Sequence, residues 1–77
     1  MQKRIDYYMS LPYTMEIIPD TEQGGWFIKI KELRGCMTQA DQWEDVLPMI
    51  EEAQRLWLEV ALEHDDPIPE PVSLPEA

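Results

Sequence analysis

Residues 42–64 read QWEDVLPMIEEAQRLWLEVALEH, and the spacing of the apolar residues in this stretch decides the fold. They recur at steps of three and four residues, which at about 100° per residue places them on one face of an α-helix. The apolar face holds Trp43, Val46, Leu47, Ile50, Ala53, Trp57, Val60 and Ala61. The opposite face holds Glu44, Asp45, Glu51, Glu52, Arg55, Glu59 and Glu63. The stretch predicts one long amphipathic helix.

Two features predict how this helix begins. Asp41 is followed by Glu44 in the spacing of a capping box, in which the Asp side chain accepts a backbone N–H of the first turn. Pro48 removes one backbone hydrogen bond and clashes with the preceding turn. It therefore predicts a kink or an irregular first turn near Glu44 and Asp45.

Three apolar residues of this helix do not belong to its apolar face. Leu62 projects onto the charged face, and Met49 and Leu56 flank it. A monomer would expose them, and chains this short bury too little surface to be very stable alone. We therefore expect Met49, Leu56 and Leu62 to form an interface in a homo-oligomer, either a dimer or a tetramer.

The residues before the helix alternate between apolar and polar, as half-buried β-strands do. Residues 13–18 and 26–31 form two such runs, joined by a polar connection with two glycines, which predicts a β-hairpin. Glu16 and Lys29 lie on its polar face and are expected to come opposite each other. Residues 36–38 are expected to add a third strand, and residues 3–10 are read as a short helix or an extended arm.

Together these patterns predict an α+β fold, in which a three-stranded antiparallel sheet is packed by one long amphipathic helix. The order is β-β-β-α. Trp26, Trp43 and Trp57 are expected in the core because each lies on the apolar face of its element. We expect one domain over residues 1–66, followed by a proline-rich tail over residues 67–77 that runs as an extended polyproline II segment.

Charge is distributed very unevenly along the 77 residues, which carry 6 basic and 16 acidic side chains for a net charge of −10. Residues 1–34 are neutral, and residues 35–77 hold eleven acidic residues against a single arginine. An acidic field repels phosphate, so we expect no nucleic-acid binding by this chain alone and a basic protein as its natural partner. The competing interpretation is that the acidic surface only keeps a small protein in solution.

The acidic residues that we expect to contact such a partner lie on the helix and just after it. They are Glu44, Asp45, Glu51, Glu52, Glu59, Glu63, Asp65, Asp66 and Glu70. Neighbouring carboxylates on a helix diverge by about 100°, so they cannot converge on one reacting atom. One cysteine and one histidine complete neither a disulfide nor a zinc site of four protein ligands. We expect no enzyme, no metal and no cofactor.

Two features of the sequence predict where the protein is located in the cell. The N-terminus has a basic pair but no apolar run after it, unlike a signal peptide, and no stretch of the chain is apolar enough to span a membrane. The sequence therefore predicts a cytoplasmic protein without membrane contact.

Short segments along residues 7–71 together resemble the HicB antitoxins. They are YYMSLPY at 7–13, IIPD at 17–20, GGW at 24–26, ELRGCMTQ at 32–39, IEEA at 50–53, WL at 57–58 and IPEP at 68–71. Their order is the specific part of the resemblance. The chain departs from the family pattern at Arg34, where proline is common, at residues 40–42, where Gly-Asp-Thr or Gly-Glu-Thr is common, and at Pro48 within the helix.

The resemblance implies a β-β-β-α core similar to a partial ribonuclease H fold, without the catalytic carboxylates. It implies an antitoxin that binds HicA, a small basic RNA-cleaving toxin with an active-site histidine, and covers its RNA-binding surface and active site. The alternative is an orphan oligomerising or regulatory module. Promoter autorepression is expected only if a DNA-binding domain lies beyond Ala77, as it does in many full-length relatives.

Overall fold

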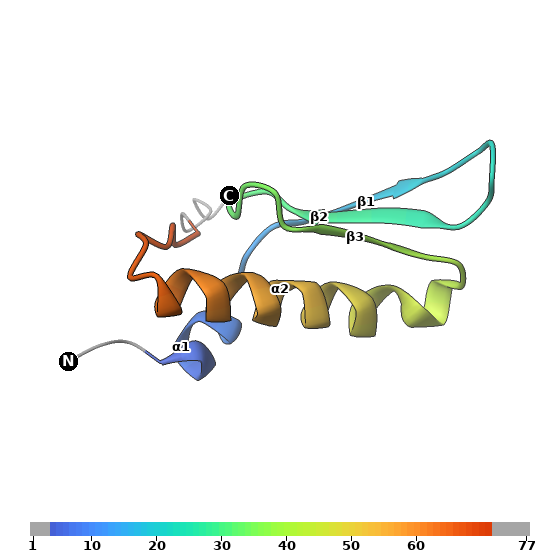
Figure 1. Cartoon of the computed structure of the whole chain (residues 1–77). Helices are drawn as coiled ribbons and strands as arrows, with labels where there is room; N and C mark the ends of the chain where they lie inside the picture. Colours follow the sequence, from blue (N-terminus) through green and yellow to red (C-terminus); the bar gives the residue numbers. More distant parts are fainter. Residues whose placement is uncertain (1–3, 72–77) are drawn as a thin grey trace, which may run out of the picture.

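In the computed structural model, which describes residues 4–71, three strands form a sheet and a long helix crosses one of its faces (Figure 1). The elements in chain order are α1 (Ile5–Met9), β1 (Met15–Pro19), β2 (Trp26–Ile30), β3 (Met37–Ala40), the 3₁₀ helix η1 (Trp43–Asp45) and α2 (Val46–Glu63). Of the two alternatives for the N-terminal segment, a short helix or an extended arm, the structure has the helix, α1. It packs against α2. The α+β fold predicted from the sequence is confirmed.

The sheet is antiparallel, and its strands follow one another in the order β1-β2-β3. Glu16 pairs with Lys29 as predicted, and the Lys29 Nζ lies 3.5 Å from the Glu16 Oε1. Strand β1 begins two residues later than expected and extends one residue further, to Pro19. Since β1 is an edge strand, the missing N–H of Pro19 is tolerated there.

The turn between β2 and β3 depends on Gly35. The Cys36 N–H donates to the Leu33 carbonyl at 2.9 Å, and Gly35 has a φ of 84°, which favours glycine. Arg34 precedes Gly35, and its carbonyl accepts a hydrogen bond of 2.9 Å from the indole Nε1 of Trp57. The turn is therefore tied directly to α2.

The helix contributes a narrow ridge to the core rather than a broad face. Its buried residues recur at steps of three and four and are Val46, Ile50, Gln54, Leu58 and Ala61. From the sheet and its connections they meet Ile28, Ile30, Leu33, Cys36 and Ala40. The buried face is rotated relative to the sequence prediction: Leu58 is fully buried but was not assigned to the apolar face, whereas Val60 is 47% exposed. Leu47 lies within about 20° of Leu58 around the helix, but it is the second residue of α2 and is 55% exposed.

The positions of the three tryptophans differ in part from the prediction that all of them lie in the core. Trp26 and Trp57 are half-buried and pack against the core, but Trp43 is 58% exposed. Trp43 lies on η1, ahead of α2, and it contacts Trp26 edge to face with ring centroids 4.9 Å apart. The expectation that all three are core residues is therefore wrong for Trp43.

Helix α2 starts without the predicted cap. Gln42 precedes η1 and Asp45 precedes α2, and neither side chain makes a capping hydrogen bond, so the capping box of Asp41 and Glu44 is wrong. The irregular turn predicted near Glu44 is present as η1. Pro48 is the third residue of α2, where its missing N–H has no partner inside the helix in any case.

The ridge predicts unequal effects for two leucine truncations. Leu58→Ala is expected to lower the free energy of unfolding by about 2–5 kcal/mol, because it leaves a cavity in the core. Leu47→Ala, on the exposed start of α2, is expected to change it by about 0.5 kcal/mol or less. Urea unfolding followed by circular dichroism measures both. Equal losses for the two variants would contradict the difference in burial between these two positions.

Candidate partner-binding surface

All nine acidic residues predicted to bind a partner are exposed. On α2, Glu52, Glu59 and Glu63 fall within an arc of about 40° at 3.6 residues per turn. This arc lies opposite the buried ridge of α2, so the three carboxylates form a strip on the outer face of the helix. We call Glu52, Glu59 and Glu63 the acidic strip.

The other predicted acids are distributed around this strip. Glu51 lies on the side of the helix, about 100° from Glu52. Glu44 and Asp45 lie on η1 at one end of α2, whereas Asp65 and Asp66 follow the other end. The 18 residues of α2 span about 27 Å at 1.5 Å per residue. The acids therefore form an elongated surface and not one cluster.

The acidic residues at the C-terminal end of α2 oppose its dipole. Its first turn contains no acidic residue and its last turn no basic one, although Glu63, Asp65 and Asp66 gather at its C-terminal end. Negative charge there meets the negative end of the helix dipole, which costs stability. These acids therefore do not serve to stabilise the helix.

The C-terminus of α2 is closed by a Schellman motif, a pair of backbone hydrogen bonds around one residue in the left-handed conformation. The Asp66 N–H donates to the Ala61 carbonyl at 2.8 Å, and the Asp65 N–H donates to the Leu62 carbonyl at 3.2 Å. Asp65 has a φ of 56°, where glycine is usual. An acidic residue thus occupies a strained backbone position that glycine would fill at lower cost.

We expect Asp65→Gly to raise the free energy of unfolding by about 1 kcal/mol, because it relieves the left-handed strain. It also removes a charge from the negative end of the helix dipole. Asp65→Asn is the control, since it removes the charge and keeps the Cβ. Thermal unfolding measures both, and a Gly variant less stable than the Asn variant would contradict the assignment of strain.

The chain beyond α2 folds back over the N-terminal part of the domain. Ile68 packs against the core, the Tyr13 hydroxyl donates to the Pro69 carbonyl at 2.6 Å, and the Tyr7 hydroxyl donates to the Glu70 Oε1 at 2.9 Å. Glu70 is thereby placed beside α1, away from the acidic strip. The tail predicted for residues 67–77 remains a prediction, because residues 72–77 lie outside the described part of the chain.

The hydrogen bond from Tyr13 to the Pro69 carbonyl depends on the protonation of the Tyr13 hydroxyl. Its partial burial, and next the negative charge of Glu70, raise the pKa of Tyr13 to about 12, from an ordinary value of 10.0. The folded state therefore holds the phenol proton more tightly than the unfolded state does.

We expect the contribution of Tyr13 to the free energy of unfolding to be complete below pH 10. It should be lost as the pH rises from 10 towards about 12. Tyr13→Phe removes the titrating group, so the loss over this interval should become smaller. Urea unfolding at stepped pH, together with difference absorbance of tyrosinate, measures the effect. An unchanged slope in Tyr13→Phe would contradict it.

The three residues expected at an oligomer interface are separated by the structure. Met49 and Leu56 are 38% and 63% exposed. Leu62 is half-buried and packs against the core, so the expectation that a monomer exposes it is wrong.

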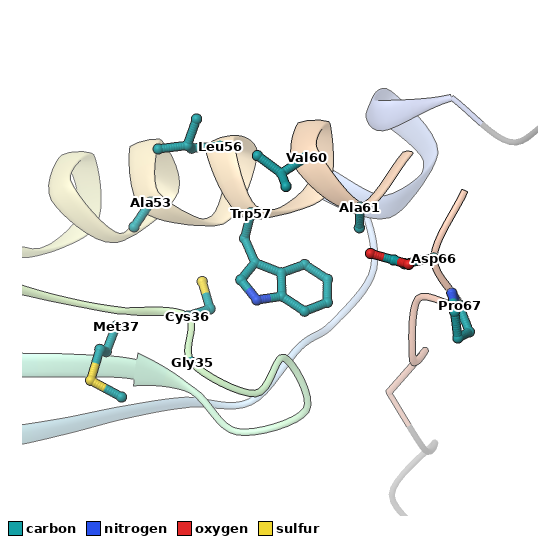
Figure 2. A pocket seen from close by; sticks show the side chains of 10 residues that line it. All are labelled: Gly35, Cys36, Met37, Ala53, Leu56, Trp57, Val60, Ala61, Asp66 and Pro67. Carbon is teal, nitrogen blue, oxygen red and sulfur yellow. The ribbon is translucent and has the colours of Figure 1, made fainter. Parts of the chain in front are cut away.

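An apolar groove of about 490 Å³ between α2 and the start of β3 was not foreseen from the sequence (Figure 2). It is lined by Gly35, Cys36, Met37, Ala53, Leu56, Trp57, Val60, Ala61, Asp66 and Pro67. Burial raises the pKa of the Cys36 thiol, which favours its neutral form and not a reactive thiolate. Among residues 4–71, no group of three or more His, Cys, Asp or Glu side chains is placed to hold a metal ion.

The fold and these surfaces define a small α+β domain that presents acidic and apolar surfaces along one helix. The chain belongs to the HicB-like antitoxins of bacterial toxin-antitoxin systems, whose family model matches residues 13–77. No curated protein and no solved structure gives a significant match. Within the described residues, no helix has the length and apolarity needed to cross a membrane. The family is one of regulatory proteins that act on a toxin.

Proposed function

We propose that this chain neutralises a small basic RNA-cleaving toxin of the HicA type by covering its RNA-binding surface and active site, and that it does so in the cytoplasm without catalysing a reaction. The family implies a toxin as the partner. The observation that carries the finer proposal is the acidic strip on the outer face of α2. A surface of this kind resembles the charge of a nucleic-acid backbone, which is the ligand that an RNA-cleaving protein binds.

Two further features support this assignment. The acids around the C-terminal end of α2 act against the helix dipole, so a partner is a better reason for them than helix stability. They are exposed at the end of the helix and just after it. Association with a basic partner is then electrostatically steered and weakens with added salt.

Charge reversal tests the proposal. Glu59→Lys lies within the acidic strip, whereas Glu22→Lys lies in the exposed connection between β1 and β2 and changes the net charge equally. We expect Glu59→Lys to raise the Kd for the basic protein encoded beside the gene by about tenfold or more. Glu22→Lys should change it by less than about twofold. Calorimetry at low and high salt, with an RNA-cleavage assay on the same samples, measures this.

The results separate the two candidate functions. Tight binding that stops RNA cleavage, but does not respond to salt or to Glu59→Lys, would contradict the acidic strip as the binding surface. Absence of binding to the basic protein would favour the orphan oligomerising module, to which the apolar groove points. Asp65→Gly adds a useful comparison, because it is expected to stabilise the fold while removing a charge from the proposed surface.

A further inference from the structure

The apolar groove between α2 and the start of β3 leaves apolar side chains exposed (Figure 2). Leu56 and Val60 contribute to it from α2 and are 63% and 47% exposed, and we call them the apolar flank of α2. Met37 contributes from β3 and is 60% exposed. Contiguous apolar patches on a folded protein mark sites where a partner or a ligand binds. The volume of about 490 Å³ lies within the usual range of binding pockets, about 300–1,000 Å³, so the groove can receive a bulky side chain.

Hydrogen bonds fix the walls of the groove. The indole Nε1 of Trp57 donates to the Arg34 carbonyl at 2.9 Å and so joins α2 to the turn before β3. The Asp66 N–H donates to the Ala61 carbonyl at 2.8 Å, which holds Asp66 and Pro67 at one end of the groove. A pocket that is formed in advance loses little conformational freedom on binding. Such a pocket suits an anchor side chain, the kind of residue that carries most of the binding energy of an interface.

Carboxylates border the groove on the side of α2. At 3.6 residues per turn, Leu56 lies about 20° from Glu63 and about 40° from Glu52 around the helix, and Val60 lies on its inner side. The acidic strip therefore runs along the rim that the apolar flank forms. Asp66 adds a carboxylate at the end of the groove and is the only charged residue among those that line it.

The charges around the groove favour a basic occupant. Lys29, Lys31 and Arg34 line a separate hollow of about 440 Å³, and no basic residue is among those that line the groove. A second copy of this chain would bring its own net charge of −10 to the acidic border, where like charges repel. A segment that combines an apolar side chain with lysine or arginine would instead match both the groove and its border.

We propose that the groove receives a bulky apolar side chain from a basic segment of the toxin partner, while lysine or arginine residues on either side of that side chain contact the acidic strip and Asp66. Such an anchor deepens the proposed function, on which it rests. The carboxylates supply attraction that salt screens, and the groove supplies attraction that salt does not weaken. The partner is expected to expose a leucine, isoleucine, methionine or phenylalanine with basic neighbours.

Val60→Ser tests the groove separately from the charges. It removes apolar surface from the groove and leaves every carboxylate in place, and serine and valine have similar helix propensities. Leu47→Ser is the matched control, since Leu47 is also an exposed apolar residue of α2 but does not line the groove. By calorimetry with the basic protein encoded beside the gene, we expect Val60→Ser to raise the Kd about five- to tenfold at both low and high salt. Leu47→Ser should change it by less than about twofold.

A thiol placed in the groove reports directly on its occupancy. Val60→Cys puts a cysteine on the exposed apolar flank, whereas the native Cys36 is 3% exposed and should react more slowly. Alkylation of Val60→Cys by N-ethylmaleimide should slow about tenfold when the basic protein is present at about ten times its Kd for this variant. Leu47→Cys should be alkylated at the same rate with and without the basic protein.

The outcomes separate the groove from the function on which it rests. Tight binding that Val60→Ser does not weaken would overturn the groove as the anchor site and leave the toxin as the partner. A complex in which Val60→Cys is alkylated as fast as in the free chain would do the same. Absence of any binding to the basic protein would overturn both proposals. Alkylation that slows as the concentration of the chain alone rises would assign the groove to a second copy instead. Circular dichroism checks that each variant is folded.

Discussion

The packing of one ridge of α2 against the sheet is the constraint on which the other features depend. Ile50 and Leu58 are fully buried on this ridge, and they meet Ile28 and Leu33, which are buried to the same degree. Because the ridge is narrow, most of the helix circumference remains at the surface. Its rotation decides which side chains face outwards, and so it places both the acidic strip and the apolar flank.

The two exposed sides of α2 have different chemistry. The outer face carries carboxylates that a basic protein would neutralise, whereas the flank beside β3 carries Leu56 and Val60, which only an apolar surface would cover. The surface that the proposed function assigns to a basic partner is therefore distinct from the apolar groove.

The sheet was largely predictable from the sequence because each strand pairs with the next one along the chain. Alternation placed Ile28 and Ile30 inside, and the hairpin brought Glu16 opposite Lys29. The rotation of α2 was not predictable, since apolar residues cover more than half of its circumference and only contact with the sheet selects Leu58 over Val60.

The surfaces were less accessible to sequence reasoning than the fold. Exposed acids were predicted from charge alone, because a carboxylate seldom enters a core. The groove joins Met37 to Leu56, and the tail contacts join Tyr13 to Pro69, so both combine segments far apart in the chain. No local periodicity reports such contacts. The only sequence signal for the tail contacts was a pair of tyrosines, whose hydroxyls need hydrogen-bond partners when they are partly buried.

The return of the chain over Tyr7 and Tyr13 makes its two ends dependent on each other. The hydrogen bonds of Tyr13 and Tyr7 join segments that are 56 and 63 residues apart in the chain. Most of residues 64–71 are already exposed, and Ile68 is the one that packs against the core. A protease would therefore find its first cleavage site there, and a partner that holds this segment closed would lengthen the lifetime of the whole protein.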